Sequence, residues 1–177
     1  MPDPSGTSDR RARDLSASLQ ALRRIVRQLR VANGGVEKST GLSAAQLFVL
    51  EAVGAAPGAS LSELAARTLT DRTSVAAVVD RLSARALVER RRSTTDRRRV
   101  ELVLTDAGGA LLAQAPHPPT RQILEGLGTL DDRQLRRLAV GLSRLVRGMG
   151  LAESPAVMLF EDAPGGTERG APGAEDG

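Results

Sequence analysis

The densest cluster of charged side chains in this sequence consists of six arginines between positions 90 and 99. They form two groups on either side of residues 93–96 and comprise Arg90, Arg91, Arg92, Arg97, Arg98 and Arg99. A guanidinium group stays protonated at neutral pH and matches the geometry of phosphate oxygens, so the cluster could bind a polyanion. A solvated surface loop would also explain such a run of charges. The flanking sequence has to decide between these two interpretations.

The rest of the sequence offers little for catalysis or metal binding. Cysteine is absent, and His117, set between Pro116 and Pro118, is the only histidine. One imidazole without partners makes neither a usual metal site nor a general acid–base pair. The adjacent acids Asp131 and Asp132 fit the start of a helix, where they interact favourably with the helix dipole. We therefore expect no enzyme activity, no metal and no cofactor, and we interpret His117 as a surface or packing residue.

The composition indicates a mainly helical protein with a basic body. Of 177 residues, 41% are hydrophobic and 26% are charged, and Phe48 and Phe160 are the only Phe, Tyr or Trp residues. A core built from Leu, Val and Ala favours helices. Residues 152–177 carry a net charge of −5, which leaves +9 on residues 1–151 against +4 for the whole chain. Because the sequence has neither a signal-peptide pattern nor an apolar run of ~20 residues, we expect a cytoplasmic protein without a membrane span.

A repeated apolar spacing predicts an N-terminal dimerisation helix over residues 12–36. The apolar positions recur every seven residues, with two more between them: Leu15, Leu22, Leu29 and Val36, then Leu19 and Val26. That spacing suits a helix that packs lengthwise against another helix. We expect residues 1–11 to be a disordered leader and the Asn-Gly-Gly segment at 33–35 to weaken the last turns.

Residues 43–104 predict a winged helix-turn-helix lobe. Three helices are expected, with N-terminal signals at Ser43, in a capping box over residues 60–63, and at Thr70 or Asp71. The third of these helices covers about residues 72–85, and its narrow apolar stripe consists of Val75, Val78, Val79 and Leu82. Two helices joined by a short turn, the second so sparsely apolar, are typical of a helix-turn-helix.

The arginine cluster follows directly on this helix pair. Leu87 and Val88 begin one strand, and the apolar alternation over 99–104 predicts a second strand. Residues 93–96 then form the turn of an arginine-edged hairpin. A hairpin after a helix-turn-helix is the order of elements in a winged helix.

The C-terminal third predicts further dimerisation helices over residues 105–150. Thr105 is a good N-cap, and prolines at 116, 118 and 119 should end its helix before a shorter one restarts near Thr120. After Asp131, a second heptad-like stripe, in steps of three and four, is formed by Leu135, Leu138, Leu142, Leu145 and Met149. Residues 151–177 are rich in Gly, Pro, Glu and Asp and predict an acidic, disordered tail. We interpret the apolar patch at 156–160 within this tail as loose rather than docked.

The segment DRTSVAAVVDRLSARALVERRRSTTDRRRVELVLTDAG, residues 71–108, resembles the recognition helix and wing of MarR-type regulators. The most specific match is Asp96-Arg97-Arg98 followed by the alternating strand and LTDAG at 104–108, and the pattern extends from about 12 to 149. The resemblance implies a homodimer with interlocking terminal helices on a pseudo-palindromic DNA operator. Each recognition helix would enter a major groove and each wing an adjacent minor groove. It also implies a repressor released by a small ligand, often an aromatic acid, bound near the junction of the dimerisation and DNA-binding regions.

By this resemblance, Arg98 is the wing-tip residue inserted in the minor groove, and Asp96 braces its geometry. A guanidinium suits a narrow minor groove, where negative potential is concentrated and partial desolvation has to be tolerated. Asp96 can also stabilise the turn through its own side chain, and the two roles are compatible.

We predict DNA contact for eleven residues of the helix and wing: Arg72, Thr73, Ser74, Ala77, Arg81, Arg90, Arg92, Asp96, Arg97, Arg98 and Arg99. Ordinary first-turn polarity explains Thr73 and Ser74 without DNA, and local pairing with an acid explains Arg81 equally well. Ala76 and Ala77 stand where the family often has a polar or basic pair, which implies fewer base contacts and more weight on DNA shape.

Two more departures from the family pattern affect the expected geometry. Ala86 stands where the family usually has glycine, and alanine at positive φ costs about 1 kcal/mol unless the turn takes another shape. The proline cluster at 116–119 leaves open how the penultimate helix contributes to the dimer and the ligand pocket.

The leading hypothesis is a ligand-responsive transcriptional repressor that binds duplex DNA as a homodimer. One alternative is a constitutive regulator or architectural DNA-binding protein without a ligand. The other is a helical interaction module whose basic wing docks on an acidic protein surface. Only DNA binding requires both a steep fall of affinity with salt and a preference for one operator over random duplex.

Overall fold

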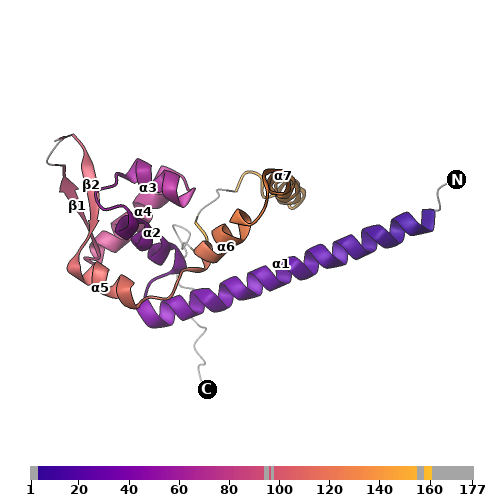
Figure 1. The fold of residues 1–177 in the computed structure, drawn as a ribbon, viewed down its shortest axis with the longest axis horizontal. Coiled ribbons are helices and arrows are strands. Elements are labelled where there is room, and N and C mark those ends of the chain that lie inside the picture. The colour runs from indigo at the N-terminus through magenta and orange to yellow at the C-terminus, as the bar shows by residue number, and fades with distance from the viewer. Residues whose placement is uncertain (1–3, 94–95, 97, 155–157, 161–177) are drawn as a thin grey trace, which may run out of the picture.

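The computed structural model describes residues 4–93, 96, 98–154 and 158–160 of the 177-residue chain. Its elements are α1 (Pro4–Thr40), α2 (Ala44–Ala55), α3 (Leu61–Thr68), α4 (Arg72–Ala84), β1 (Val88–Arg92), β2 (Val100–Leu104), α5 (Asp106–Gln114), α6 (Pro119–Gly128) and α7 (Asp132–Gly148). Helices α2–α5 and the hairpin gather into one lobe, from which α1 projects as a long rod (Figure 1). The predicted class, mainly helical with a small β-hairpin, is confirmed.

Helix α1 starts earlier than the apolar repeat predicted. It is a single helix of 37 residues that begins at Pro4. The expected disordered leader is therefore wrong for residues 4–11, while residues 1–3 lie outside the described part. Proline suits a first helical turn, where its missing N–H would have had no partner. Once the helix is nucleated further along, each added residue costs little, so the polar segment extends it.

The Asn-Gly-Gly segment does not weaken the end of α1 as expected, because the helix continues to Thr40. The Asn33 side chain is occupied on both sides. Its amide donates to Glu37 Oε1 one turn later (2.7 Å), and its oxygen accepts from the Ala44 N–H at the start of α2 (3.1 Å). These bonds keep Asn33 from competing for its own backbone, and they fasten α1 to the lobe.

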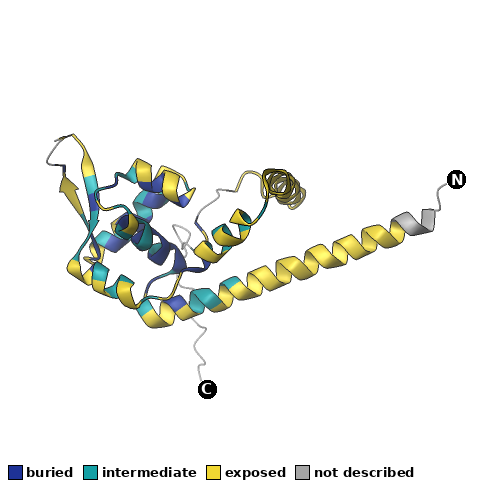
Figure 2. Ribbon diagram, in the orientation of Figure 1, coloured by how far each residue is buried: buried dark blue, intermediate teal, exposed yellow. Residues whose placement is uncertain are grey.

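The hydrophobic core lies around α2, which packs against α3, α4, α5, α6 and β2 (Figure 2). The apolar stripe predicted for α4 is completely buried, with Val75, Val78, Val79 and Leu82 each 0% exposed. The opposite face of α4 is thereby turned outward.

The predicted helix starts are confirmed by their hydrogen bonds. Ser43 and Gln46 form a capping box at α2, and Ser60 and Glu63 form one at α3. Asp71 caps α4 by accepting from the Ser74 N–H at 2.9 Å. The short turn between α3 and α4 passes through Leu69, which has a left-handed φ of 52° and a largely exposed side chain. These two helices form the predicted helix-turn-helix.

Strands β1 and β2 pair antiparallel, from Val88 opposite Leu104 to Arg92 opposite Val100. A single further bridge joins Leu102 to Ala59 in the α2–α3 connection, so the body of the lobe supplies a short third edge to the hairpin. We call this hairpin, residues 88–104, the wing.

At the junction between α4 and the wing, the sequence left open whether Ala86 adopts a strained, positive φ or the turn takes another shape. The structure has the positive φ. Ala86 has a φ of 54°, in the left-handed region that favours glycine. The Leu87 N–H donates back to the Leu82 carbonyl at 3.0 Å, which closes the helix as a left-handed residue at this position allows. The Thr105 hydroxyl donates to the Ala86 carbonyl at 2.7 Å. The turn is thus held from both sides.

The C-terminal helices follow their predicted signals closely. Thr105 caps α5, and a capping box of Asp131 with Gln134 starts α7. The prolines end α5 at Gln114, and α6 begins at Pro119, next to the predicted Thr120, since proline fits the first helical position.

The tail is not wholly loose as we had interpreted it. Residues 158–160 lie against the lobe, and Met158 is only 7% exposed and belongs to the core cluster. Met158 and Leu159 line a pocket together with Phe48 and Leu124. Residues 155–157 and 161–177 lie outside the described part of the chain.

Helices α1 and α7 expose apolar side chains. In α1, between 37% and 61% of each of Leu15, Leu19, Leu22, Ile25 and Val26 is exposed. In α7 the corresponding range is 37–45% for Leu135, Leu138, Leu142 and Leu145. Among the described residues, no helix is both long enough and apolar enough to cross a membrane.

Candidate nucleic-acid interface

The outward face of α4 lies beside the wing and begins with polar residues. Arg72 and Thr73 are exposed in its first turn, and Ala77 and Arg81 are half-buried further along. The face therefore presents a cation and a hydroxyl near the helix N-terminus and a small methyl-bearing surface behind them. Such a face can approach DNA closely, because alanine adds little bulk and can contact a thymine methyl.

Ser74 serves the structure of α4 in addition to any contact with DNA. Its hydroxyl donates to Asp71 Oδ2 at 2.7 Å while its N–H donates to Oδ1 at 2.9 Å. These two bonds, the backbone bond first, hold the pKa of the Asp71 carboxyl below its usual value. The first-turn role of Ser74 is therefore confirmed, and its contact with DNA remains a prediction.

The tip of the wing is built on Asp96. Its Oδ1 accepts from the Arg98 N–H at 2.9 Å, and its carbonyl accepts from the Arg99 N–H, also at 2.9 Å. The Ser93 N–H closes the turn by donating to the Arg99 carbonyl at 3.0 Å. The turn-forming role of Asp96 is confirmed, and Arg98 next to it is exposed. Arg97, another predicted contact, lies outside the described residues.

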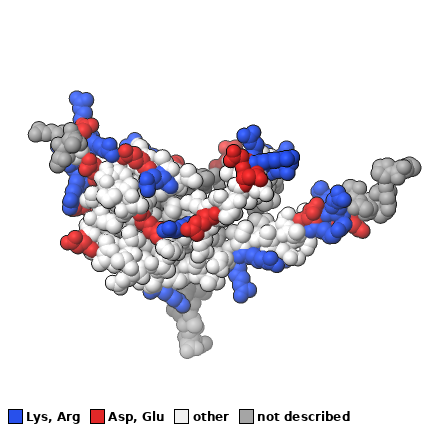
Figure 3. All heavy atoms as spheres, viewed as in Figure 1, with Lys and Arg blue, Asp and Glu red and all other residues white. Residues whose placement is uncertain are grey.

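The wing arginines differ in what holds them. Arg90 forms an ion pair with Asp80 of α4 (2.6 Å), and Arg99 forms one with Glu63 of α3 (2.8 Å). Arg91 pairs with Glu89 on its own strand, and Arg92 is exposed. Basic side chains nevertheless gather around the wing, with acids among them (Figure 3). The wing is therefore a basic surface, part of whose charge is balanced by carboxylates of the helices.

Glu63 is prearranged for its contact with the wing. Its Oε2 accepts from both the N–H (2.7 Å) and the hydroxyl (2.9 Å) of Ser60. These bonds, and to a lesser extent the charge of Arg99, lower the pKa of the Glu63 carboxyl. Glu63 therefore stays ionised at neutral pH.

An open pocket of about 710 Å³ lies at the other side of α2, between α3, α5 and α6. Its apolar lining comes from Phe48, Ala52, Ala55, Leu112 and Ala115. Three cationic or ionisable side chains and one carboxylate also line it: Arg67, His117, Arg121 and Glu51.

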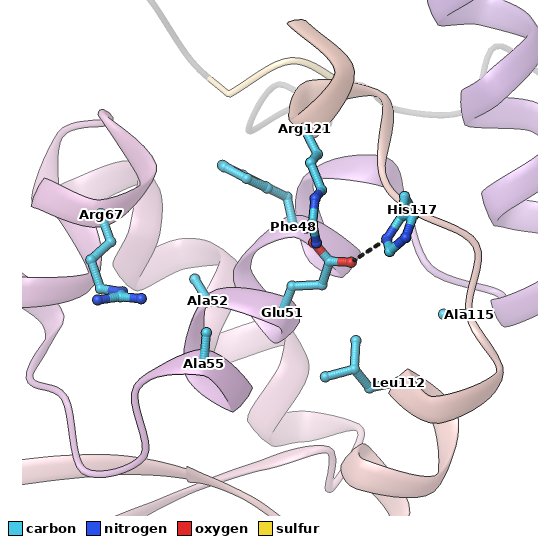
Figure 4. A pocket seen from close by; sticks show the side chains of 9 residues that line it. All are labelled: Phe48, Glu51, Ala52, Ala55, Arg67, Leu112, Ala115, His117 and Arg121. Atoms are coloured by element: carbon cyan, nitrogen blue, oxygen red, sulfur yellow. Dashed lines mark hydrogen bonds and ion pairs between the residues drawn. The ribbon is translucent and has the colours of Figure 1, made fainter. Parts of the chain in front are cut away.

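Charged groups of this pocket converge on Glu51. Figure 4 shows His117 and Arg121 directed at its carboxylate, with Arg67 on the facing side of the pocket. His117 Nδ1 lies 3.4 Å from Glu51 Oε1, and Arg121 Nη1 lies 3.9 Å from Oε2. His117 is 70% exposed, as expected of a surface residue, whereas Glu51 is 20% exposed. The two contacts are long, but Arg121 Nε also pairs with Glu125 Oε1 at 3.1 Å. An anion entering the pocket would therefore compete with Glu51 for His117 and with both carboxylates for Arg121.

Comparison with known proteins identifies this architecture. A profile of the MarR family matches residues 40–99, which span the helix-turn-helix and most of the wing. A protein named for transcriptional regulation of the hcr operon in Thauera aromatica is 32% identical over 112 residues, which are 63% of this chain and 68% of that protein. The chain belongs to the MarR family. As a member of this family, the chain is a DNA-binding transcriptional regulator with a winged helix-turn-helix.

Two further MarR-like proteins extend the comparison. The repressor MdtR of Bacillus subtilis strain 168 is 34% identical over 102 residues, covering 58% of this chain and 64%, slightly under two thirds, of MdtR. The crystal structure of Streptococcus pneumoniae FabT in complex with DNA matches with a TM-score of 0.50 and 18% identity, over 78% of this chain and 97% of that chain. At that identity the FabT likeness shows the shared fold.

Sequence reasoning found the basic residues of this MarR-family protein but missed the acids that hold them. Glu63 was recognised only as a capping residue, and neither Asp80 nor Glu51 was singled out. No local pattern indicates these partners, because the pairs join residues from different elements. The capping box predicts where the Glu63 carboxylate lies, but it does not indicate that Arg99 pairs with it.

Proposed function

We propose that this MarR-family protein is a homodimeric, sequence-specific DNA-binding repressor, with α4 in the major groove and the wing in the adjacent minor groove. The observation that carries the proposal is the exposed Arg98 on a hydrogen-bonded turn beside the outward face of α4. A narrow minor groove attracts such a guanidinium without base-edge hydrogen bonds.

The exposed apolar stripes of α1 and α7 support the dimer. The stripe residues named above, five on α1 and four on α7, are each 37–61% exposed. Rows of apolar side chains along helices are normally buried against another surface. A second copy of the chain offers the same two stripes, and pairing through a two-fold axis would bury both.

The pocket beside α2 supports control by a small ligand. An apolar floor with two arginines at its rim suits a small aromatic or anionic molecule. The pocket is lined by residues of α3, which belongs to the helix-turn-helix, and by residues of α5 and α6. A bound molecule would therefore alter the packing of the helix-turn-helix against α5 and α6. The alternative of a constitutive regulator without a ligand predicts DNA affinity that no such molecule changes.

The decisive experiment selects duplexes from a random library with the wild-type protein and measures affinity for the enriched sequence against salt. We expect a strong preference over random duplex and a steep salt slope, and we expect Arg98→Ala to weaken binding by about 1–3 kcal/mol. Since Arg98 is exposed, its removal should leave the thermal unfolding unchanged. Unchanged affinity of Arg98→Ala at matched salt would refute the placement of the wing. Absence of any enriched duplex would favour the protein-docking module instead.

A further inference from the structure

Arg99 is tied to the body of the lobe although it follows Arg98 in the sequence. Its Nη2 lies 2.8 Å from Oε2 and 3.1 Å from Oε1 of Glu63, and 3.3 Å from the carbonyl oxygen of Gly58. One guanidinium nitrogen therefore reaches both the start of α3 and the turn before it.

This contact lies towards the wing tip. Closer to the base of the wing, backbone bonds join Leu102 to Gly58 (2.9 Å) and Ala59 (3.0 Å), and Arg90 pairs with Asp80 at the level of Leu102. Beyond this level, the Arg99 side chain fastens the wing to α3 and to the turn before it. Its own backbone closes the tip turn through Ser93 and Asp96, so a displacement of Arg99 would be passed to the tip.

We propose that Arg99 is a positioning residue for DNA binding: anchored by Glu63, it holds the outer half of the wing so that the neighbouring Arg98 is directed to the duplex. This inference rests on the proposed DNA-binding function. It replaces our sequence-based prediction that Arg99 contacts DNA.

The geometry of Glu63 favours anchoring over release. The carboxylate is fixed by two bonds from Ser60 and cannot turn away from Arg99 without losing the cap of α3. A carboxylate placed beside a DNA-binding surface repels phosphates, unless it is neutralised by a partner. Arg99 supplies that neutralisation only while it remains on Glu63.

Arg99 could either position the wing or bind a phosphate itself. The direction in which Glu63→Gln changes the affinity for DNA distinguishes these two roles. Glutamine keeps the capping box with Ser60, because its side-chain oxygen still accepts from the Ser60 N–H, but it removes the charge that holds Arg99. If Arg99 positions the wing, Glu63→Gln and Arg99→Gln each weaken binding to the selected duplex, by roughly tenfold, and the double variant is no weaker than either. If Arg99 is instead a phosphate ligand restrained by Glu63, Glu63→Gln tightens binding.

Glu63→Gln and Arg99→Gln form one double-mutant cycle. A second double-mutant cycle tests whether Arg99 acts through Arg98. In an Arg98→Ala background, the further change Arg99→Gln should lower affinity by less than about twofold, because the residue it positions is gone. Lys38→Gln, which removes one exposed positive charge from the end of α1, measures the general effect of charge on binding. Thermal unfolding of each variant reports whether the lobe itself has changed.

The outcomes are distinct. Tighter or unchanged binding of Glu63→Gln overturns the inference, as does a full loss from Arg99→Gln in the Arg98→Ala background. If the wild-type protein enriches no duplex, the proposed function fails and this inference falls with it. If the wild type binds its duplex but the losses of affinity in the two double-mutant cycles simply add, the proposed function stands and the positioning role of Arg99 does not.

Discussion

The left-handed turn at Ala86 predicts that glycine substitutions at two nearby alanines change the free energy of unfolding in opposite directions. We expect Ala86→Gly to stabilise the protein. An L-residue with a Cβ pays roughly 1–2 kcal/mol in this region of φ, and Ala86 sits there with a φ of 54°. The greater freedom of glycine in the unfolded chain takes back about 0.5–1 kcal/mol. The net gain, taken between the middles of these two ranges, should be about 0.7 kcal/mol, because the exposed Cβ of Ala86 contributes little packing.

Ala84→Gly is the matched control. Ala84 is also exposed, but it is the last residue of α4 and has helical geometry. Glycine there should destabilise by about 0.5–1 kcal/mol, since it only adds unfolded-state freedom to a helical position. Urea unfolding at one fixed protein concentration measures both changes, and for a chain of this size they correspond to about 1–4 °C in Tm of opposite sign. Equal destabilisation by both substitutions would refute the argument that Ala86 is strained.

Two further predictions concern charge. Residues 161–177 carry a net charge of −4, and removing them leaves Met158 in place. This truncation should tighten binding to random duplex several-fold at low salt and have little effect at high salt. The reason is that the acidic side chains compete with DNA phosphates only while salt does not screen their charge. Fluorescence anisotropy at two salt concentrations measures this, and equal affinities at low salt would rule it out. Ser60→Ala and Arg99→Gln should each raise the pKa of Glu63, because the first removes the hydroxyl that donates to its carboxylate and the second removes the charge and hydrogen bond of Arg99, while the backbone N–H bond of residue 60, the largest cause of the low pKa, stays in both variants. The stabilisation due to this low pKa is present above the unfolded pKa of about 4.5 and is lost as pH falls through the lower folded value. An NMR titration in which either variant left the pKa of Glu63 unchanged would contradict this reasoning.

Most of the lobe could be predicted because its signals are local. The caps at Ser43, Ser60 and Asp71 each involve residues three apart, and the buried stripe of α4 follows helical periodicity. The turn at Ala86 was indicated by the family resemblance, which left its φ open, and the structure shows the left-handed form. In each case the residues that decide the structure lie within one or two turns of each other, so the sequence displays them side by side.

The features that could not be predicted depend on contacts between distant segments. Met158 is buried because the chain returns to the lobe after α7. The apolar patch at 156–160 allowed that return, but its composition does not identify the surface that receives it. The continuation of α1 through Asn33 depends partly on a bond to α2. The pairing of Arg99 with Glu63 joins residues 36 positions apart, and the arginine cluster by itself does not indicate which of its members pair with carboxylates of the lobe.

The division of the wing arginines has a consequence for the salt dependence of binding. Each phosphate neutralised by a cation adds about 0.9 to the slope of log affinity against log salt concentration for duplex DNA. If all six wing arginines contacted phosphates, each wing would contribute about 5 to that slope. With Arg90 held by Asp80, Arg91 by Glu89 and Arg99 by Glu63, the contribution should not exceed about 3. The contribution of one wing is half the difference in slope between the wild-type dimer and a variant with all six arginines changed to glutamine, provided that both bind the same duplex. A difference near 5 per wing would mean that Asp80, Glu89 and Glu63 release their partners to the DNA, and the wing would then be a loosely held basic arm instead of a braced one.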